Sequence, residues 1–493
     1  MPETELTPLE EVHNLLQPQD MILRQLWLFA DAPVAILHPI ANDWQADHEE
    51  VARQRVNAVT ALWRDGGVQA LRDLAARSGV NRGILGYAIG RATMPEGIKD
   101  DLLRSSLLSI DEQEAAAATG IVIGASSDAV DRTKRLHAWC EIARVEEWPT
   151  FAVVRLLLLC DSNPHTWELA STWSAEVKRA YWEKQWLLAP GLSSAEVNIA
   201  AREMMAAGRA AQALQFVVFP YKDKITPALL AELLVSAAER GQETGAQSLR
   251  VYDVESAFDL LDRSGEFGDD KLAELEFKLL VYLEHSRRRG RLAIHRVMAK
   301  EPSLFRDLIC LVFPAKNGLE DESDDNKPSA REIRIATLCW GLLRNWQTVP
   351  GLRNGDVDRA VLEDWIVRAR ALCGEADRLS VCDAKIGNML AHAPVDLHDG
   401  IWPCRAVREI LPVFGSDNLE AGLVTGGINM RGMTVRDPRD GGEQERTLQA
   451  KYVGWAKTLR LTAPRAANVL DQIARHYDAD AKREDDRVKR MDW

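Results

Sequence analysis

The stretch WQADHEEVARQRVNAVTALWRDGG (Trp44–Gly67) shows the pattern that decides the fold. Its apolar residues recur every three or four positions, which is the spacing of one face of an α-helix. Four residues form this stripe: Val51, Val56, Val59 and Leu62. Asp65 and the glycine pair that follows it are helix-stop signals. The stretch therefore predicts an amphipathic helix that ends at the glycines.

The same period recurs along almost the whole chain, and sustained apolar–polar alternation, the mark of strands, is nearly absent. Examples are VQALRDLAARSG (68–79), SSAEVNIAAREMMAAG (193–208) and DVDRAVLEDWIVRARALCG (356–374). Roughly twenty such segments are separated by short loops with Gly, Ser, Asn or Pro, and short helices in a row bury their faces by stacking on neighbours. The sequence thus predicts an all-α fold, an irregular α-solenoid of HEAT- or TPR-like hairpins. Only one weak internal echo supports a repeat, VVFPYKDK (217–224) and LVFPAKNG (311–318).

The composition narrows the classes of function. The chain has 493 residues, 46% of them hydrophobic, and a formal net charge of −13. Such a charge argues against a general nucleic-acid binder, because phosphate neutralisation needs a basic surface. Seven cysteines without a CxxC pair are typical of a reduced cytosolic protein. The first residues do not resemble a signal peptide, and the longest apolar runs fall short of the ~20 residues that span a bilayer. We expect a cytoplasmic protein that does not enter membranes.

An acidic segment divides the chain. NGLEDESDDNKPS (317–329) has five acidic residues, one proline and a single large apolar residue, Leu319. Such runs are solvated. The sequence predicts an N-terminal helical array (1–316), an acidic linker or loop (317–328) and a C-terminal helical region (329–493) that contains a Gly/Arg-rich loop (426–442). A long loop between consecutive helices is the favoured alternative to a true linker.

Motifs of self-contained enzymes are missing from the sequence. It has no GxxxxGK[ST] phosphate loop, no GxGxxG after a strand, no HExxH and no GxSxG. We therefore lean towards a non-enzymatic protein without cofactors. A metal site was considered at HAPVDLHDG, with His392, Asp396, His398 and Asp399 as ligands. A polar loop between helices is the favoured interpretation of that stretch, and we predict no metal ligands.

A basic cluster occupies EHSRRRGRLAIHRVMAK (284–300). Its members are Arg287, Arg288, Arg289, Arg291, His295, Arg296 and Lys300. They are candidates to bind phosphate, an acidic protein surface or the chain's own acidic segment. The alternative is a solvated corner between two helices.

Aromatic residues concentrate in HTWELASTWSAEVKRAYWEKQW (165–186). The set is Trp167, Trp173, Tyr181, Trp182 and Trp186. Exposed aromatics interleaved with cations are typical of stacking platforms for bases. Acidic residues cancel most of the local positive charge, so packing in the core is favoured.

The stretch GGINMRGMTVRDPRDGGEQER (426–446) raises the possibility of a ligand site. Its candidate binding residues are Arg431, Arg436, Arg439 and Arg446. A helix ending at Gly426–Gly427 is expected before it, capped by Ser416, and another helix after it. Glu443 and Glu445 fall in the first turn of that second helix, where an anion site would avoid carboxylates. An ordered loop in which arginines pair with acids is favoured over a ligand site.

Several segments resemble a known group of proteins. They are DGIWPCRAVREIL (399–411), the turn NMRG (429–432), GGEQER (441–446), YVGWAKTL (452–459) and LLQPQDMILRQLWLFAD (15–31). This chain looks like the C-terminal helical region of large bacterial antiphage-defence proteins, whose N-terminal parts are NTPase- or sirtuin-like effectors. The resemblance implies a sensor or scaffold that binds a protein and passes the event to an effector. The given sequence has no effector part before the array, so we expect either a subunit that works with a separately encoded effector or NTPase, or a piece of a longer protein. A phage protein is the other implied partner.

Three hypotheses follow. The first is a non-enzymatic protein-interaction scaffold or sensor subunit of a bacterial antiphage system. The second is an effector or nucleotide-responsive subunit with its ligand site at residues 426–446. The third is a nucleic-acid-binding subunit that uses residues 287–300.

Overall fold

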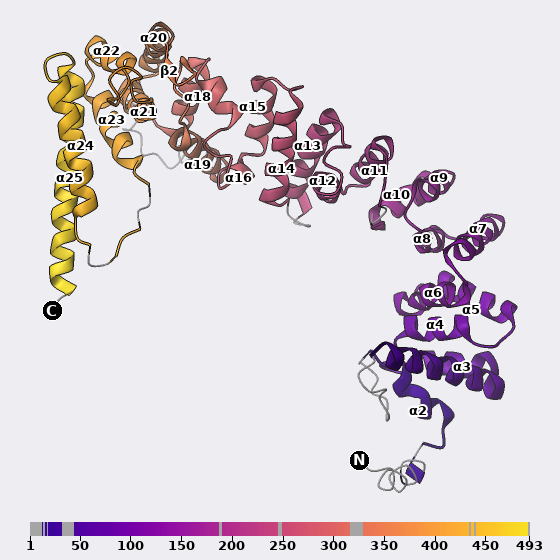
Figure 1. Cartoon of the computed structure of the whole chain (residues 1–493). Helices are drawn as coiled ribbons and strands as arrows, with labels where there is room; N and C mark the ends of the chain where they lie inside the picture. Colours follow the sequence, from indigo (N-terminus) through magenta and orange to yellow (C-terminus); the bar gives the residue numbers. More distant parts are fainter. Residues whose placement is uncertain are drawn as a thin grey trace. The chain divides into compact units, whose positions relative to one another are not determined.

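The computed structural model describes residues 12, 15–16, 18–31, 44–186, 190–244, 249–315, 329–432, 435–437 and 440–491. These parts form 24 α-helices, a short 3-10 helix and one two-stranded antiparallel hairpin. Helices make up 73% of the structure. The predicted all-α class is confirmed (Figure 1).

The chain divides into two compact units, Met1–Arg209 and Ala210–Trp493. The helices of the first unit are α2 (Met21–Gln25), η1 (Leu26–Phe29), α3 (Trp44–Ala75), α4 (Arg82–Arg91), α5 (Glu96–Leu108), α6 (Glu112–Ala125), α7 (Ala129–Val145), α8 (Thr150–Leu159), α9 (Pro164–Ser171), α10 (Ala175–Lys184) and α11 (Ser194–Ala206).

The second unit contains the remaining helices and both described strands. They are α12 (Ala210–Val218), α13 (Pro227–Thr244), α14 (Val251–Ser264), α15 (Asp269–Lys278), α16 (Leu280–Leu283), α17 (Ala293–Met298), α18 (Pro302–Val312), α19 (Ala330–Asn345), β1 (Leu352–Arg353), β2 (Asp356–Val357), α20 (Arg359–Glu375), α21 (Leu379–Leu390), α22 (Arg405–Phe414), α23 (Asp417–Asn429), α24 (Glu443–Leu459) and α25 (Pro464–Met491).

Helix packing is local within each unit. The main contacts join helices that are one to three places apart in chain order, such as α4 with α6, α12 with α13, and α24 with α25. Contacts of this kind are what stacked helical hairpins make. The solenoid arrangement and the likeness to HEAT or TPR repeats stay predictions.

Helix α3, which contains the stretch Trp44–Gly67, buries most of the predicted apolar stripe. Val51, Val59 and Leu62 are buried, and Val56 is partly exposed. Gly67 leaves the helical conformation with φ 61°, and a second helical segment continues from there to Ala75. Because φ near +60° costs glycine little, the predicted stop becomes a kink inside α3.

The predicted division at residues 317–328 lies within the second unit, and that segment is outside the described residues. The helices on its two sides contact each other directly. α18, which precedes the segment, packs against α19 and α20, which follow it.

Helix α23 ends later than the sequence predicts. Ser416 caps it by accepting a hydrogen bond from the backbone N–H of Leu419, as predicted. The predicted end at Gly426–Gly427 is wrong, because the helix continues to Asn429. A Cβ at Gly426 would lie 2.6 Å from the Cβ of Ala391 next to α21. This glycine allows a close helix contact and does not end the helix.

The basic segment 287–300 is positioned by the core of the second unit. Trp346 donates its indole N–H to the carbonyl of His295 at 3.2 Å, and Trp365 donates to the carbonyl of Met298 at 2.9 Å. The rings of Trp346 and Trp365 pack on each other and on Phe305, with centroids 5.2–5.4 Å apart. These contacts join α17 to the residue after α19 and to α20.

Among the described residues, no helix combines the length and the apolar character that crossing a membrane requires.

Candidate functional site

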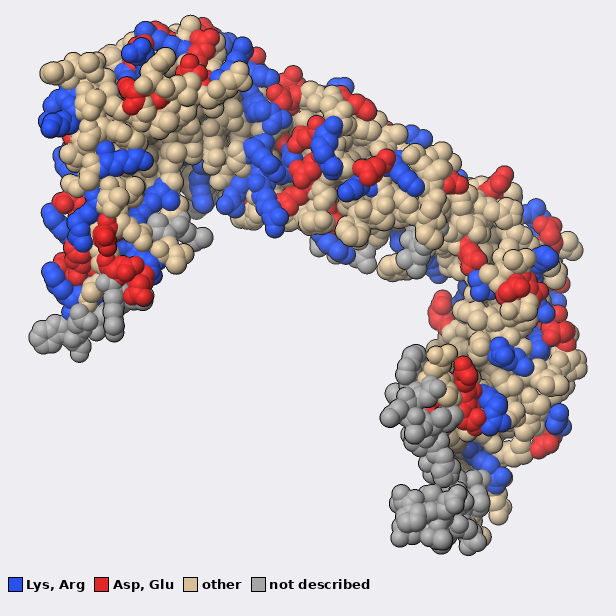
Figure 2. Space-filling model, in the orientation of Figure 1, with Lys and Arg blue, Asp and Glu red and all other residues tan. Residues whose placement is uncertain are grey.

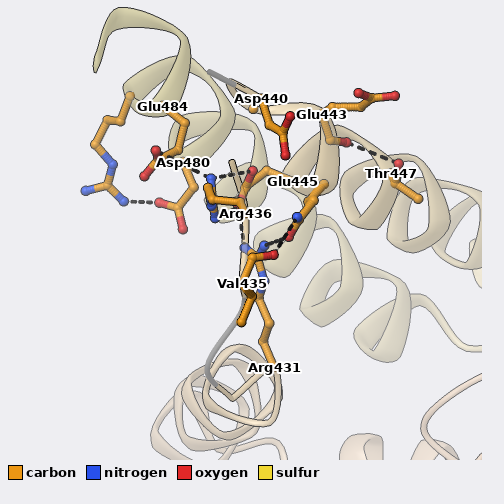
Figure 3. Close-up of polar contacts among 12 residues, drawn as sticks. Arg431, Val435, Arg436, Asp440, Glu443, Glu445, Thr447, Asp480 and Glu484 are labelled. Atoms are coloured by element: carbon orange, nitrogen blue, oxygen red, sulfur yellow. Dashed lines mark hydrogen bonds and ion pairs between the residues drawn. The ribbon is translucent and has the colours of Figure 1, made fainter. Parts of the chain in front are cut away.

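The Gly/Arg-rich loop is organised around Glu445 in the first turn of α24. Glu445 is 1% exposed. Its Oε1 lies 2.6 Å from a guanidinium nitrogen of Arg431 and 2.6 Å from one of Arg436. Figure 3 shows both arginines pointing at this carboxylate. The loop thus closes on a buried ion cluster of three side chains.

The two arginines determine the charge state of Glu445. Burial by itself raises the pKa of this carboxyl, but the hydrogen bonds from Arg436 and Arg431 together outweigh burial and hold it below the usual value. The hydrogen bond to Glu445 in turn raises the pKa of Arg436. Glu445 and Arg436 are therefore both charged at neutral pH.

Further contacts tie the same loop to α25. Arg436 also approaches Glu484 at 3.4 Å, and the guanidinium of Arg431 lies 5.7 Å from the ring centroid of Tyr477. Arg446 pairs with Asp485 at 2.7 Å, and Asp485 also accepts the backbone N–H of Gly442 at 2.9 Å.

The candidate Arg439 lies outside the described residues. The three described arginines of the loop each face a carboxylate of the protein itself. Their charge is therefore already balanced within the second unit.

The basic cluster 287–300 separates into members with different surroundings. Arg288 is 2% exposed and contacts Asp259 at 2.6 Å, Asp262 at 2.7 Å and the buried Glu276 at 3.5 Å. This arginine joins α14 and α15 to the turn after α16. It is a buried structural residue and is not accessible to a ligand.

Two more cations of this cluster share one acid. Arg296 and Lys300 lie 2.8 Å and 2.7 Å from the two carboxylate oxygens of Asp269 at the start of α15. Burial raises the pKa of Asp269, yet the hydrogen bonds from Lys300 and Arg296 together keep it below its usual value.

The histidine of the cluster is part of the core. His295 is fully buried, and its Nε2 lies 3.1 Å from the carbonyl oxygen of Leu342 in α19. Burial lowers its pKa to about 4. The imidazole is therefore neutral at physiological pH and adds no positive charge to the surface.

The remaining arginines of the cluster, Arg287, Arg289 and Arg291, are exposed. No carboxylate of the described residues is within ion-pair distance of their guanidinium groups. Lys and Arg side chains gather over the region of α16 and α19 in Figure 2. This part of the cluster is available for an outside contact.

The stretch that contained the metal candidates forms the loop between α21 and α22, as predicted. Asp396 accepts backbone N–H groups of His398 and Arg405 at 3.0 Å and 2.9 Å. Asp399 receives two hydrogen bonds from Arg408, at 2.7 Å and 2.8 Å. The described parts hold no cluster of three or more His, Cys, Asp or Glu placed to bind a metal.

The aromatic cluster divides in the same way. Trp167, Tyr181 and Trp182 are buried, and the ring centroids of the two tryptophans lie 5.5 Å apart, so the predicted core packing is confirmed for them. Trp173 is partly exposed and lies beneath the guanidinium of Arg144 at 5.0 Å. For Trp186 the prediction of burial is wrong, because it lies beyond the end of α10 and is 74% exposed.

No known family, curated protein or solved structure matches the chain. The resemblance to the helical region of antiphage-defence proteins therefore stays a prediction, and the site has to be argued from its own residues.

One exposed apolar surface is not predicted from the sequence, the outer face of α19. Ile333 and Trp340 are exposed there, while Cys339, Leu342 and Leu343 of the same helix are buried. The available signal was the spacing of the apolar residues, which form two stripes on α19 where a surface helix normally has one.

Proposed function

We propose that the chain is a non-enzymatic protein-interaction scaffold or sensor subunit. The observation that carries this proposal is the local packing of short helices within each unit. In such an array each helix is buried by its neighbours, and the outer helix edges form an extended surface suited to binding another protein.

The polar clusters support the same function. In the Glu445, Arg288 and Asp399 clusters each arginine pairs with carboxyl groups of the chain itself, so these contacts stabilise the helix packing. The second hypothesis needed Arg431 and Arg436 for a ligand, and both contact Glu445 at 2.6 Å. A nucleotide phosphate at this loop would have to displace Glu445 from both arginines, which favours the scaffold function.

The expected partner is a protein encoded near the same gene. On the sequence resemblance alone, we propose that it is an effector or NTPase of an antiphage system, or a phage protein that triggers it. The proposal of a scaffold does not depend on this setting.

The test uses the full-length chain. We expect a tagged chain, co-expressed with the products of neighbouring genes, to co-elute with one of them in size-exclusion chromatography at defined stoichiometry. The purified chain alone should neither hydrolyse nucleoside triphosphates nor cleave nucleic acid. Turnover by the isolated chain that persists through successive purification steps would overturn the proposal.

A further inference from the structure

A groove with a volume of about 520 Å³ lies between the end of α18 and the outer face of α19. Its lining is mainly apolar, with Leu311 and Phe313 on one side and Ile333 and Trp340 on the other. Leu311 and Ile333 are 51% and 54% exposed. Large exposed apolar side chains that gather in one groove are typical of a binding site for another protein.

The apolar face of α19 has the geometry of a helix interface. Ile333, Ala336, Thr337 and Trp340 follow the spacing i, i+3, i+4 and i+7 and all line the groove. This face extends along two helical turns, about 10 Å. A partner helix with apolar residues at the same spacing presents a stripe of equal length.

Cations flank this face. The guanidinium of Arg344 lies 5.2 Å from the ring centroid of Trp340, and the ammonium of Lys385 in α21 lies 5.7 Å from the ring of Phe313 and 5.9 Å from that of Trp340. Arg334 lies on α19 beside Ile333 and is exposed. Arg334, Arg344 and Lys385 are called the groove cations below. Within the described residues none of them has a carboxylate at ion-pair distance.

The one acidic residue of the lining is occupied elsewhere. Glu332 accepts the backbone N–H of Ser329 at 2.8 Å in the capping box of α19, and these contacts hold its pKa below the usual value. Lys385 is half-buried, and its loss of water lowers its pKa. An ammonium group that has lost water and has no acidic partner is stabilised by an incoming carboxylate.

The exposed arginines of the basic cluster extend the same surface. Glu284, just after α16, lies so close to α19 that a Cβ at Gly341 would be 2.8 Å from its Oε1. The turn that carries Arg287, Arg289 and Arg291 therefore runs beside the C-terminal half of α19. These three arginines add positive charge beside the C-terminal half of α19.

We propose that the groove between α18 and α19 is the docking site for an acidic amphipathic helix of a partner protein. The apolar stripe of that helix packs between Leu311, Ile333 and Trp340, and its flanking carboxylates pair with the groove cations. This inference rests on the proposed scaffold function and specifies the surface and the chemistry of its partner.

A protein helix fits the groove better than a nucleic acid does. The lining is mostly aliphatic, and Trp340 already carries the guanidinium of Arg344 on its ring, which leaves less aromatic surface for stacking bases. The net charge of −13 also opposes a polyphosphate chain while leaving local pairing intact.

The test measures binding of a defined probe to the full-length chain. The probe is a fluorescein-labelled helical peptide of about 18 residues with leucines at i, i+3, i+4 and i+7 and glutamates on both sides of the stripe. We expect saturable binding by fluorescence anisotropy that weakens as salt rises, because exposed ion pairs are screened. A scrambled peptide of the same composition should bind at least about tenfold more weakly.

Matched variants locate the site. Ile333→Ser and the double change Arg334→Glu with Arg344→Glu should each weaken probe binding by about tenfold or more. The controls are Val367→Ser, at a position that is 51% exposed on α20, and Arg353→Glu on the hairpin, both outside the groove lining. Controls and test variants should have the melting temperature of the wild type.

Several results would overturn the docking proposal. The first is an equal loss of binding in the control variants. The second is tighter binding of a labelled oligo(dT) than of the peptide at the same groove. The third is peptide binding only after the acidic residues 320–325 are neutralised. The last result would assign the groove to the chain's own acidic segment. If the groove variants still co-purify with a partner that the wild type binds, the docking site is wrong and the scaffold function stands.

Discussion

Two buried glutamates in the second unit, Glu445 and Glu276, differ in a way that explains the arginine clusters. Both are at most 1% exposed, and each lies beside arginine. The pKa of Glu445 lies below the usual value, whereas burial raises the pKa of Glu276 above it. Nearly equal exposure therefore goes with opposite pKa directions, because Glu276 lies deeper among other atoms and loses more of its hydration.

The number and distance of the arginines add to this difference. Arg431 and Arg436 both approach Glu445 to 2.6 Å. Glu276 has Arg288 at 3.5 Å, and that arginine lies closer to Asp259 and Asp262. Hydrogen bonds from Ile294 and Ala293 favour the ionised form of Glu276 but do not offset its loss of water. Two close cations lower the pKa of Glu445 enough to outweigh its burial, whereas one shared cation does not offset the burial of Glu276.

The largest expected effect comes from removing the shared cation. Arg288→Ala removes the arginine that contacts Glu276, Asp259 and Asp262. Loss of one member of a buried ion cluster costs about 3–5 kcal/mol. We expect a marked fall in the midpoint of thermal unfolding, measured by circular dichroism.

The neighbouring Arg289 is the matched control. It is exposed and has no carboxylate within ion-pair distance among the described residues. Arg289→Ala should therefore leave the midpoint almost unchanged. Equal effects of the two changes would contradict the buried role of Arg288.

A smaller loss is expected at the loop. Arg431→Ala with Arg436→Ala removes both cations from Glu445, but the two arginine side chains are 16% and 17% exposed and water can partly replace them. We expect a loss of about 2–3 kcal/mol. Thermal unfolding of the purified double variant measures this loss of stability. Intact stability together with loss of a partner or ligand would favour a binding site at this loop.

The pH dependence of stability tests the opposite pKa directions. The folded pKa of Glu445 is depressed, so its contribution is present above the unfolded pKa, about 4.3, and is lost as pH falls through the folded value. The folded pKa of Glu276 is raised, so its contribution is greatest below the unfolded pKa and is lost as pH rises through the folded value.

Variants in which glutamine replaces each glutamate measure how the contribution of that carboxyl to stability changes with pH. The stability of wild type minus Glu445→Gln should increase as pH rises from about 3 to about 5 and then stay level, and the same difference for Glu276→Gln should decrease as pH rises above about 4. Urea unfolding at several pH values measures both. Two differences that change in the same direction would show that the arginine count does not decide the charge state.

Much of the fold could be predicted from the sequence because helical period and caps are local signals. The stripe that includes Val51 and Leu62 and the cap at Ser416 were found in this way. Gly426 shows the limit of such signals. A glycine that ends a helix and a glycine that allows close packing look the same in the sequence, and only the position of Ala391 distinguishes them.

The candidate sites could be predicted only in part for a similar reason. The acids near Arg431 and Arg436 in the sequence made charge pairing the favoured interpretation of the loop. Arg288 is different, because its partner Asp259 is 29 residues away and its neighbours Arg287 and Arg289 look identical to it in sequence. Which arginine of the three faces inwards depends on the turn after α16, which the sequence pattern does not specify.

The smallest expected effect is at the edge of the Glu445 cluster. Arg446 pairs with Asp485 at 2.7 Å, but their side chains are 53% and 35% exposed, so water screens the pair. Arg446→Ala should lower the free energy of unfolding only slightly, measured by urea unfolding at low salt, and less still at high salt. The carboxylate of Asp485 still accepts the backbone N–H of Gly442 at the start of α24, so Asp485→Ala should cost more than Arg446→Ala. A larger loss of stability for Arg446→Ala than for Asp485→Ala would contradict this expectation. The salt bridge would then stabilise the fold more than the backbone contact does. Buried and surface arginines would differ less than their exposure indicates.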